Sequence, residues 1–177
     1  MLDAARAFFD EGEVRPTAEA LAERAGVSPA SLYRYFDRLD DLPRLVFEAQ
    51  VADVAHLVGV PIEGRPLAER VRDFVHGRIA VYERVQGTAR MGRSRAIDHA
   101  EIAESLAAAR RRWSRQVRMV FAVELDRLTP AAARDVAAMV DTVASFEAWD
   151  LLTTVHGLPR SAVRSRLCAA VHRTLDP

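Results

Sequence analysis

The stretch AGVSPASLYRYF, residues 25–36, decides how the first quarter of the chain folds. Gly26 lies between two short helical patterns and is expected to adopt a positive φ, because a sharp turn there favours a residue without a Cβ. Ser28 is expected to cap the next helix, and Pro29 to be its first residue, where the missing N–H of proline costs nothing. The stretch therefore predicts a tight turn followed by a short helix.

The wider segment TAEALAERAGVSPASLYRYF, residues 17–36, predicts a helix-turn-helix. Thr17 is expected to cap its first helix, and the apolar pair Leu32 and Phe36, four residues apart, lies on one face of the second. A short helix held in this way leaves its N-terminal residues exposed, which suits the DNA major groove. An ordinary helical hairpin is the alternative. The predicted base-facing residues are Pro29, Ala30, Ser31, Tyr33, Arg34 and Tyr35, and the predicted phosphate-facing residues are Thr17 and Ser28.

The whole chain is expected to be all-α, because alanine, leucine, arginine and glutamate dominate it and no alternating strand pattern occurs. We predict about nine helices, with Thr129 capping the one that begins at Pro130. Residues 86–99 are predicted to be irregular or to contain a short helix. The helices are expected over residues 2–10, 17–25, 28–36, 38–58, 67–85, 101–128, 131–155 and 159–175.

Composition and domain pattern indicate a soluble cytoplasmic protein of two parts. No segment reaches the roughly 18–20 apolar residues that span a bilayer, and the N-terminus does not resemble a signal peptide. The single cysteine, Cys168, lies in an apolar helical stretch and is expected to pack in the core. We predict a three-helix DNA-binding head over residues 1–46 and a larger helical domain over residues 47–177.

The charge distribution is unusual for a DNA-binding head. Over residues 1–46, six arginines stand against nine acidic residues, a net charge of −3, which leaves +3 for the remainder of a neutral chain. A DNA-binding domain normally shows the opposite bias. We therefore expect few phosphate contacts and a shallow dependence of DNA affinity on salt.

The helix-turn-helix segment resembles the TetR family of transcriptional regulators. The family pattern matches at Thr17, Leu21, Ala22, Ala25, Gly26, Val27, Ser28, Leu32, Tyr33 and Phe36. The resemblance implies an all-helical homodimer with two DNA-binding heads, in which Ser31, Tyr33 and Tyr35 face DNA and a larger domain binds a small molecule. The chain begins inside the first helix, which the family precedes with a basic arm. Leu39 occupies the position of a phosphate-binding lysine, which Arg38 is expected to replace.

The larger domain offers candidates for an effector pocket and a dimer interface. Aromatic and semi-polar side chains of the middle helices suit a mostly apolar pocket, although plain core packing is the alternative for each of them. The pocket candidates are His56, Phe74, Arg78, Tyr82, Met91, Trp113, Phe121, Phe146 and Trp149. The interface candidates lie on the last two helices, at Val136, Val140, Val143, Glu147, Leu151, Val163, Leu167 and Val171.

These patterns predict a ligand-responsive regulator, expected to be a repressor, that binds a palindromic operator as a homodimer and is released by a small-molecule effector. One alternative is a TetR-like ligand or protein sensor with weakened or lost DNA binding. Another is a small helical metal enzyme built on Asp98, His99, Glu101 and Glu104, in DHAEIAE. No nucleophile elbow, phosphate loop, dinucleotide fingerprint or zinc motif occurs, so neither an enzyme nor a bound metal or cofactor is predicted.

Overall fold

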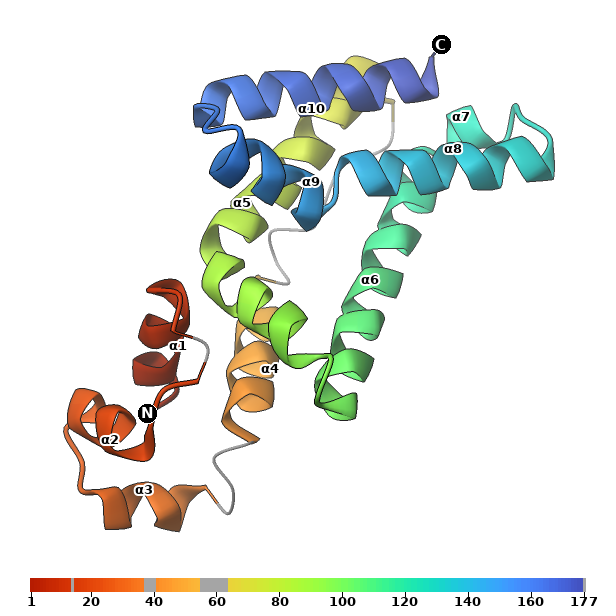
Figure 1. Cartoon of the computed structure of the whole chain (residues 1–177). Coiled ribbons are helices and arrows are strands. Elements are labelled where there is room, and N and C mark those ends of the chain that lie inside the picture. Colours follow the sequence, from red (N-terminus) through yellow and green to blue (C-terminus); the bar gives the residue numbers. More distant parts are fainter. Residues whose placement is uncertain (14, 37–40, 55–63, 177) are drawn as a thin grey trace. The chain divides into compact units, whose positions relative to one another are not determined.

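The computed structural model describes residues 1–13, 15–36, 41–54 and 64–176 of the chain. Within these ranges every regular element is helical, which confirms the all-α prediction (Figure 1). The chain divides into two compact units. Unit 1 comprises residues 1–55 and 84–108, and unit 2 comprises residues 56–83 and 109–177.

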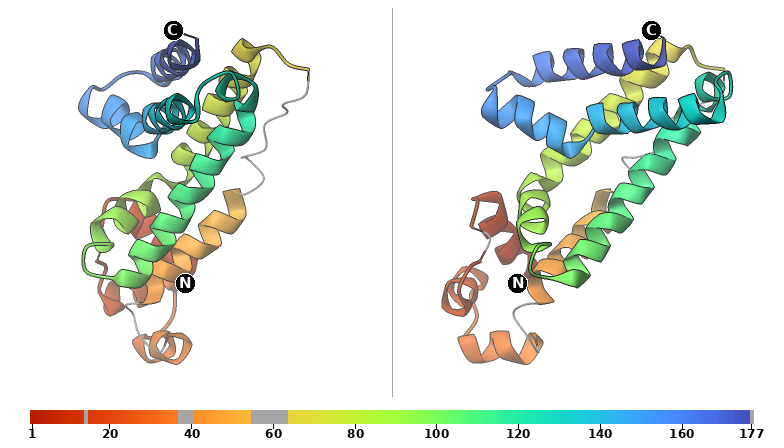
Figure 2. Two further views of the ribbon diagram at one scale, coloured as in Figure 1. Left: turned by 90° about the vertical axis from the view of Figure 1, so that its right-hand side faces the viewer. Right: turned by 45° about the vertical axis from the view of Figure 1, so that its right-hand side comes forward.

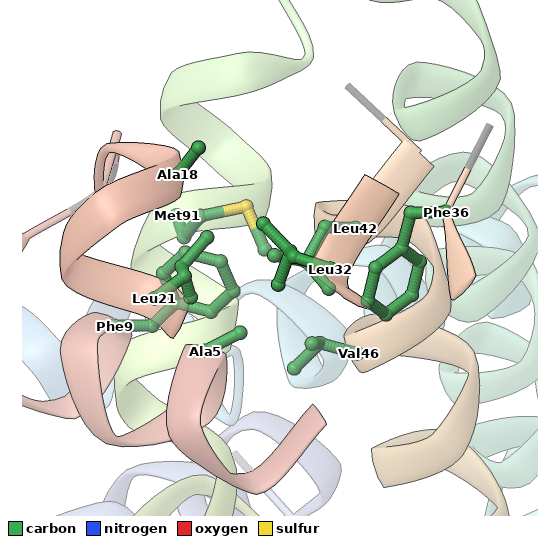
Figure 3. Close-up of a cluster of buried hydrophobic side chains, with 9 residues drawn as sticks. All are labelled: Ala5, Phe9, Ala18, Leu21, Leu32, Phe36, Leu42, Val46 and Met91. Atoms are coloured by element: carbon green, nitrogen blue, oxygen red, sulfur yellow. The ribbon is translucent and has the colours of Figure 1, made fainter. Parts of the chain in front are cut away.

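Unit 1 is built around the N-terminal helices. Helix α1 packs against α2 and α4, and α2 packs against α3. The side chains between them form a buried cluster that also includes Met91 from α5 (Figure 3). Its nine buried members are Ala5, Phe9, Ala18, Leu21, Leu32, Phe36, Leu42, Val46 and Met91. The helices of unit 1 are α1 (Leu2–Asp10), α2 (Ala18–Ala25), α3 (Pro29–Tyr35), α4 (Leu42–Val54) and the adjoining parts of α5 (Leu67–Arg95) and α6 (Ala100–Val120).

The prediction that a helix ends at residue 85, followed by an irregular segment or a short helix over residues 86–99, was wrong, because α5 continues to Arg95 through Gly87 and Gly92. Gly87 does not interrupt the helix; it lets α1 approach closely. A Cβ at this position would lie 2.5 Å from the backbone oxygen of Phe9 and the backbone nitrogen of Asp10. The glycine therefore serves packing between two helices, a role that the sequence pattern by itself does not distinguish from a helix break.

Unit 2 is built around two long C-terminal helices. Helices α8 and α10 pack against each other and run in opposite directions, with α9 and a π-helical turn connecting them (Figures 1 and 2). The elements of unit 2, besides its parts of α5 and α6, are α7 (Ala122–Leu125), α8 (Pro130–Val143), α9 (Phe146–Asp150), η3 (Leu151–Val155) and α10 (Arg160–Leu175).

Two long predicted helices are shorter in the structure. The helix expected over residues 101–128 ends at Val120, and the one expected over residues 131–155 ends at Val143. Ser145 starts a new helix, because its hydroxyl accepts a hydrogen bond from the Ala148 amide at 3.1 Å. Thr129 caps α8 as predicted, accepting from the Ala132 amide at 3.3 Å. None of the helices in the described ranges is long and apolar enough to span a bilayer.

Candidate nucleic-acid interface

The turn between α2 and α3 is fixed by hydrogen bonds within the segment itself. Gly26 has φ +67° and donates its amide to the Glu23 carbonyl at 3.1 Å, while the Val27 amide donates to the Ala22 carbonyl at 2.9 Å. This pair of bonds is the Schellman motif, which satisfies the last carbonyls of a helix and reverses the chain. The predicted glycine turn is therefore confirmed.

Both helices of the motif begin with the predicted caps. The Thr17 hydroxyl accepts from the Ala20 amide at 3.2 Å, and the Ser28 hydroxyl accepts from the Ser31 amide at 3.1 Å. Pro29 is the first residue of α3, and its fixed φ suits that position. The start of α3 is thus fixed by hydrogen bonds and backbone geometry within residues 28–31.

The two faces of α3 differ in burial as predicted. Leu32 is buried in the unit 1 cluster, and Phe36, which ends the helix, packs beside it (Figure 3). The opposite face presents Tyr33, which is 56% exposed, and the exposed Arg34. Of the remaining predicted DNA-facing residues, Thr17, Ser28, Pro29 and Ala30 are exposed and Ser31 is partly buried. The Tyr35 side chain, Arg38 and Leu39 lie outside the described residues.

Ion pairs within unit 1 engage four of the six arginines of residues 1–46. Arg24 meets Glu11 at 2.8 Å and also lies 3.7 Å from the centre of the Phe8 ring. Arg15 meets Asp98 at 3.1 Å. Further pairs join Arg6 to Asp10 at 3.7 Å and Arg44 to Glu48 at 3.0 Å. The positive charges of these guanidinium groups are therefore partly neutralised within the chain. This pairing adds to the effect of the net charge of −3 over residues 1–46, which also disfavours phosphate contacts.

Seven of the pocket candidates belong to the core of unit 2. The Tyr82 ring lies 5.6 Å from that of Phe146 and 5.9 Å from that of Trp149, measured between centroids. The Phe74 ring meets Phe121 edge to face at 5.0 Å. All of these side chains are buried. Trp113 is partly buried beside Tyr82, whereas Met91 lies in the core of unit 1 and His56 lies outside the described residues.

Arg78 is the polar centre of that core and is 1% exposed. Its Nε donates to Gln116 Oε1 at 3.2 Å, and its Nη2 donates to the Trp113 carbonyl at 2.8 Å. Its Nη1 donates to Asp141 at 2.9 Å and to the Ala144 carbonyl at 3.1 Å. All three of its nitrogens therefore have an acceptor inside the protein, so the guanidinium has the environment of a structural group.

The predicted interface residues divide between the core and the surface of unit 2. Val140, Val163, Leu167 and Val171 are buried within the single chain, where α8 packs on α10. Val136 and Val143 are partly buried. Glu147 is exposed and forms an ion pair with Arg110 at 2.9 Å. Leu151, in η3, is 50% exposed, and Met139 and Val155, which were not among the predicted interface residues, are also exposed.

The residues proposed for a metal enzyme do not converge. Asp98 is engaged by Arg15. Across the described ranges, no three histidine, cysteine, aspartate or glutamate side chains are close enough together to hold a metal ion. The metal-enzyme alternative therefore has no site in this part of the molecule.

The comparison with protein families agrees with this geometry. Residues 1–42 match the family model described as bacterial regulatory proteins, tetR family. No curated protein matches the chain. The matched segment contains α1, the whole helix-turn-helix and the exposed face of α3. The chain therefore carries a TetR-type DNA-binding domain at residues 1–42, and this match supports a DNA-binding transcriptional regulator of the TetR family.

Proposed function

We propose that the protein is a ligand-responsive repressor that binds a palindromic operator as a homodimer and leaves it when a small-molecule effector binds. The observation that carries this proposal is the geometry of α3, whose start is fixed by Ser28 and Pro29 and whose outer face presents Tyr33 and Arg34. A helix presented in this way places its first residues on base edges in the major groove. Two copies would read half-sites about 34–36 Å apart or a multiple of that distance.

The reading face is tested by DNA binding with variants of α3. Binding of the purified chain to the DNA upstream of its own gene is measured by fluorescence anisotropy. Arg34→Ala is expected to weaken binding by about 1–3 kcal/mol for each half-site, and Tyr33→Ala to weaken it less. Arg111→Ala serves as the control, because Arg111 is an exposed arginine in unit 2. Equal affinities for the Arg34 and Arg111 variants would show that α3 does not read the operator.

The homodimer is supported by the exposed apolar side chains Met139, Leu151 and Val155. Light scattering at micromolar concentration is expected to give twice the monomer mass of 19.6 kDa. Leu151→Glu is expected to shift the mass towards the monomer, since an unpaired charge is costly in an apolar interface. Ile97→Glu is the control, because Ile97 is 86% exposed but lies in unit 1. A monomeric wild-type protein at this concentration would contradict the dimer.

A second candidate function is a sensor with weakened DNA binding, and the internal pairing of Arg6, Arg15, Arg24 and Arg44 favours it. Each phosphate contact adds about 0.9 to the slope of log affinity against log salt. A repressor with few such contacts binds its operator with a shallow slope, whereas a sensor shows no specific binding at any salt concentration. A steep slope would contradict both expectations and would indicate many phosphate contacts.

A further inference from the structure

One ion pair of unit 1 joins the connection between α1 and α2 to the turn between α5 and α6. The Nη2 of Arg15 donates a hydrogen bond to Oδ2 of Asp98 at 3.1 Å. Arg15 lies between α1 and α2, and Asp98 lies in the short turn between α5 and α6. Two residues that are 83 positions apart in the sequence therefore meet within one compact unit.

Backbone hydrogen bonds fix the place of the Asp98 carboxylate. The amides of Asp98 and His99 both donate to the Arg95 carbonyl, at 3.1 Å and 3.0 Å. Helix α5 therefore ends in a closed turn, and α6 begins at Ala100, directly after it. Because the aspartate side chain is short, this backbone also limits where its carboxylate can lie, and the carboxylate lies beside Arg15.

The Arg15 side chain has spare hydrogen-bonding capacity. Its backbone amide donates to Glu13 Oε1 at 2.8 Å, which holds the main chain just before α2. Its guanidinium, by contrast, has the Asp98 carboxylate as its one acceptor among the described residues. A guanidinium carries five N–H donors, so most of those of Arg15 are open to solvent.

This ion pair is more open to solvent than the pairs formed by Arg6, Arg24 and Arg44. Both of its side chains are more than half exposed, at 63% for Arg15 and 57% for Asp98. In the other three pairs the arginine side chain is only 31–34% exposed, and Arg24 also contacts the Phe8 ring. A phosphate group can therefore reach the Arg15 guanidinium by displacing only the Asp98 carboxylate.

Arg15 also lies beside a predicted phosphate-facing residue. Thr17, the N-cap of α2, follows it by two positions, and two positions span at most about 7 Å of chain. Both residues belong to the segment that matches the TetR-type DNA-binding domain, residues 1–42. A guanidinium binds carboxylate and phosphate through the same planar, charge-assisted hydrogen bonds. The Asp98 carboxylate therefore occupies Arg15 in the way that a DNA phosphate does.

We propose that Asp98 is an autoinhibitory competitor of DNA phosphate, which occupies Arg15 in the free protein and lowers the affinity of the head for DNA. The inference rests on the proposed function in requiring that the head binds a DNA duplex, but it requires no particular operator or effector. An exposed ion pair changes an equilibrium constant by about 1.4- to 5-fold. Phosphate contacts carry no sequence information, so the effect is the same on any duplex.

Fluorescence anisotropy with two duplexes tests the proposal: the DNA upstream of the chain's own gene, and a scrambled duplex of the same length, across roughly 50–200 mM salt. Asp98→Asn is expected to tighten binding to both by about 1.4- to 5-fold for each head, and to steepen the salt slope by up to about 0.9 for each head. Glu104→Gln is the control, because it removes another exposed carboxylate of unit 1. A gain no larger than that of the control on both duplexes would overturn the proposal.

Arg15→Ala separates competition for the guanidinium from a change of net charge. In this background Asp98→Asn is expected to gain no more than Glu104→Gln does, because no guanidinium remains to be released. A full gain there would contradict the proposal. Failure of the proposed function gives a different result, since the wild type would then prefer neither duplex and Arg34→Ala would leave binding to the upstream DNA unchanged. The gain of Asp98→Asn on the scrambled duplex still decides the proposal in that case.

Discussion

The two halves of α5 carry buried polar groups of opposite kinds. In unit 2, Arg78 and Tyr82 have an acceptor for each donating atom. In unit 1, three buried polar atoms have no hydrogen-bond partner in the protein: Thr88 Oγ1, Gln50 Nε2 and Gln50 Oε1. Helix α5 thus carries Arg78, whose donors all have acceptors in the protein, and Thr88, whose hydroxyl has no partner there. The difference teaches that burial of a polar side chain is fully compensated where every donor finds an acceptor, whereas a buried polar atom without a partner in the protein requires an explanation.

The hydrogen bonds of Arg78 and Tyr82 have a clear structural role. Helix α8 ends at Val143, and the carbonyl of Ala144 accepts hydrogen bonds from Arg78 at 3.1 Å and from Tyr82 at 2.7 Å. The same guanidinium lies 4.4 Å from the centre of the Phe74 ring, an additional favourable contact. Arg78 and Tyr82 therefore satisfy a carbonyl that the break between α8 and α9 would otherwise leave buried without a partner.

The largest expected effect follows from removing Arg78. Arg78→Met should reduce the free energy of unfolding by about 3–5 kcal/mol, because it removes the buried guanidinium that pairs with Asp141 and donates to Gln116 and to the Trp113 carbonyl. Urea denaturation measures the change. Arg111→Met, on the exposed side of α6, is the control and should change it by less than about 0.5 kcal/mol. Similar decreases of the free energy of unfolding in both variants would show that the hydrogen bonds of Arg78 contribute no more to stability than an exposed arginine does.

An intermediate effect is expected from two glycines in the unit 1 half of α5. Gly87→Ala should destabilise the protein by about 1–3 kcal/mol, because the added methyl meets the backbone of α1 at Phe9 and Asp10. Gly92→Ala has room, with the Phe47 ring 3.9 Å away, and should stabilise the helix by up to about 1 kcal/mol. Denaturation of both variants in parallel checks the sign. A stabilising Gly87→Ala would show that α1 does not pack closely on α5.

The smallest expected effect concerns the Tyr82 hydroxyl. Tyr82→Phe should cost about 1 kcal/mol, because Arg78 still donates to the Ala144 carbonyl. Burial raises the pKa of this hydroxyl to about 12. Between pH 10 and pH 12 the unfolded state therefore loses this proton while the folded state keeps it, and stability falls as the pH rises.

Denaturation at alkaline pH measures how much the ionisation of the Tyr82 hydroxyl contributes to the pH dependence of stability. The stability of the wild type should decline more steeply between pH 10 and pH 12 than that of Tyr82→Phe, since the variant lacks the group. Tyr33→Phe is the matched control, because Tyr33 is 56% exposed. Identical slopes for the wild type and Tyr82→Phe would show that the hydroxyl is open to solvent.

The helix-turn-helix could be predicted from sequence in detail, whereas the polar groups of α5 could not. The sequence predicts two helix caps, at Thr17 and Ser28, and the structure confirms both. It also confirms the positive φ predicted for Gly26 and the position of Pro29 as the first residue of α3. Their hydrogen bonds close within five residues, so the local sequence contains both partners. A signal for Gln50 was present in its place among Leu42, Val46 and Val54, but only the structure shows that its amide has no partner.

The sequence by itself determined the helical class, the caps and turn of the helix-turn-helix, and the TetR-type character of residues 1–42, because these depend on residues close together in the chain. Tertiary structure alone decided that Gly87 brings helices together instead of ending one, that Arg78 is a structural group, and that Val140 and Val171 are buried within the single chain. The physical reason is the same for all three. The role of a residue at each of these positions depends on the residues that it contacts in the folded chain, and those residues are distant in sequence.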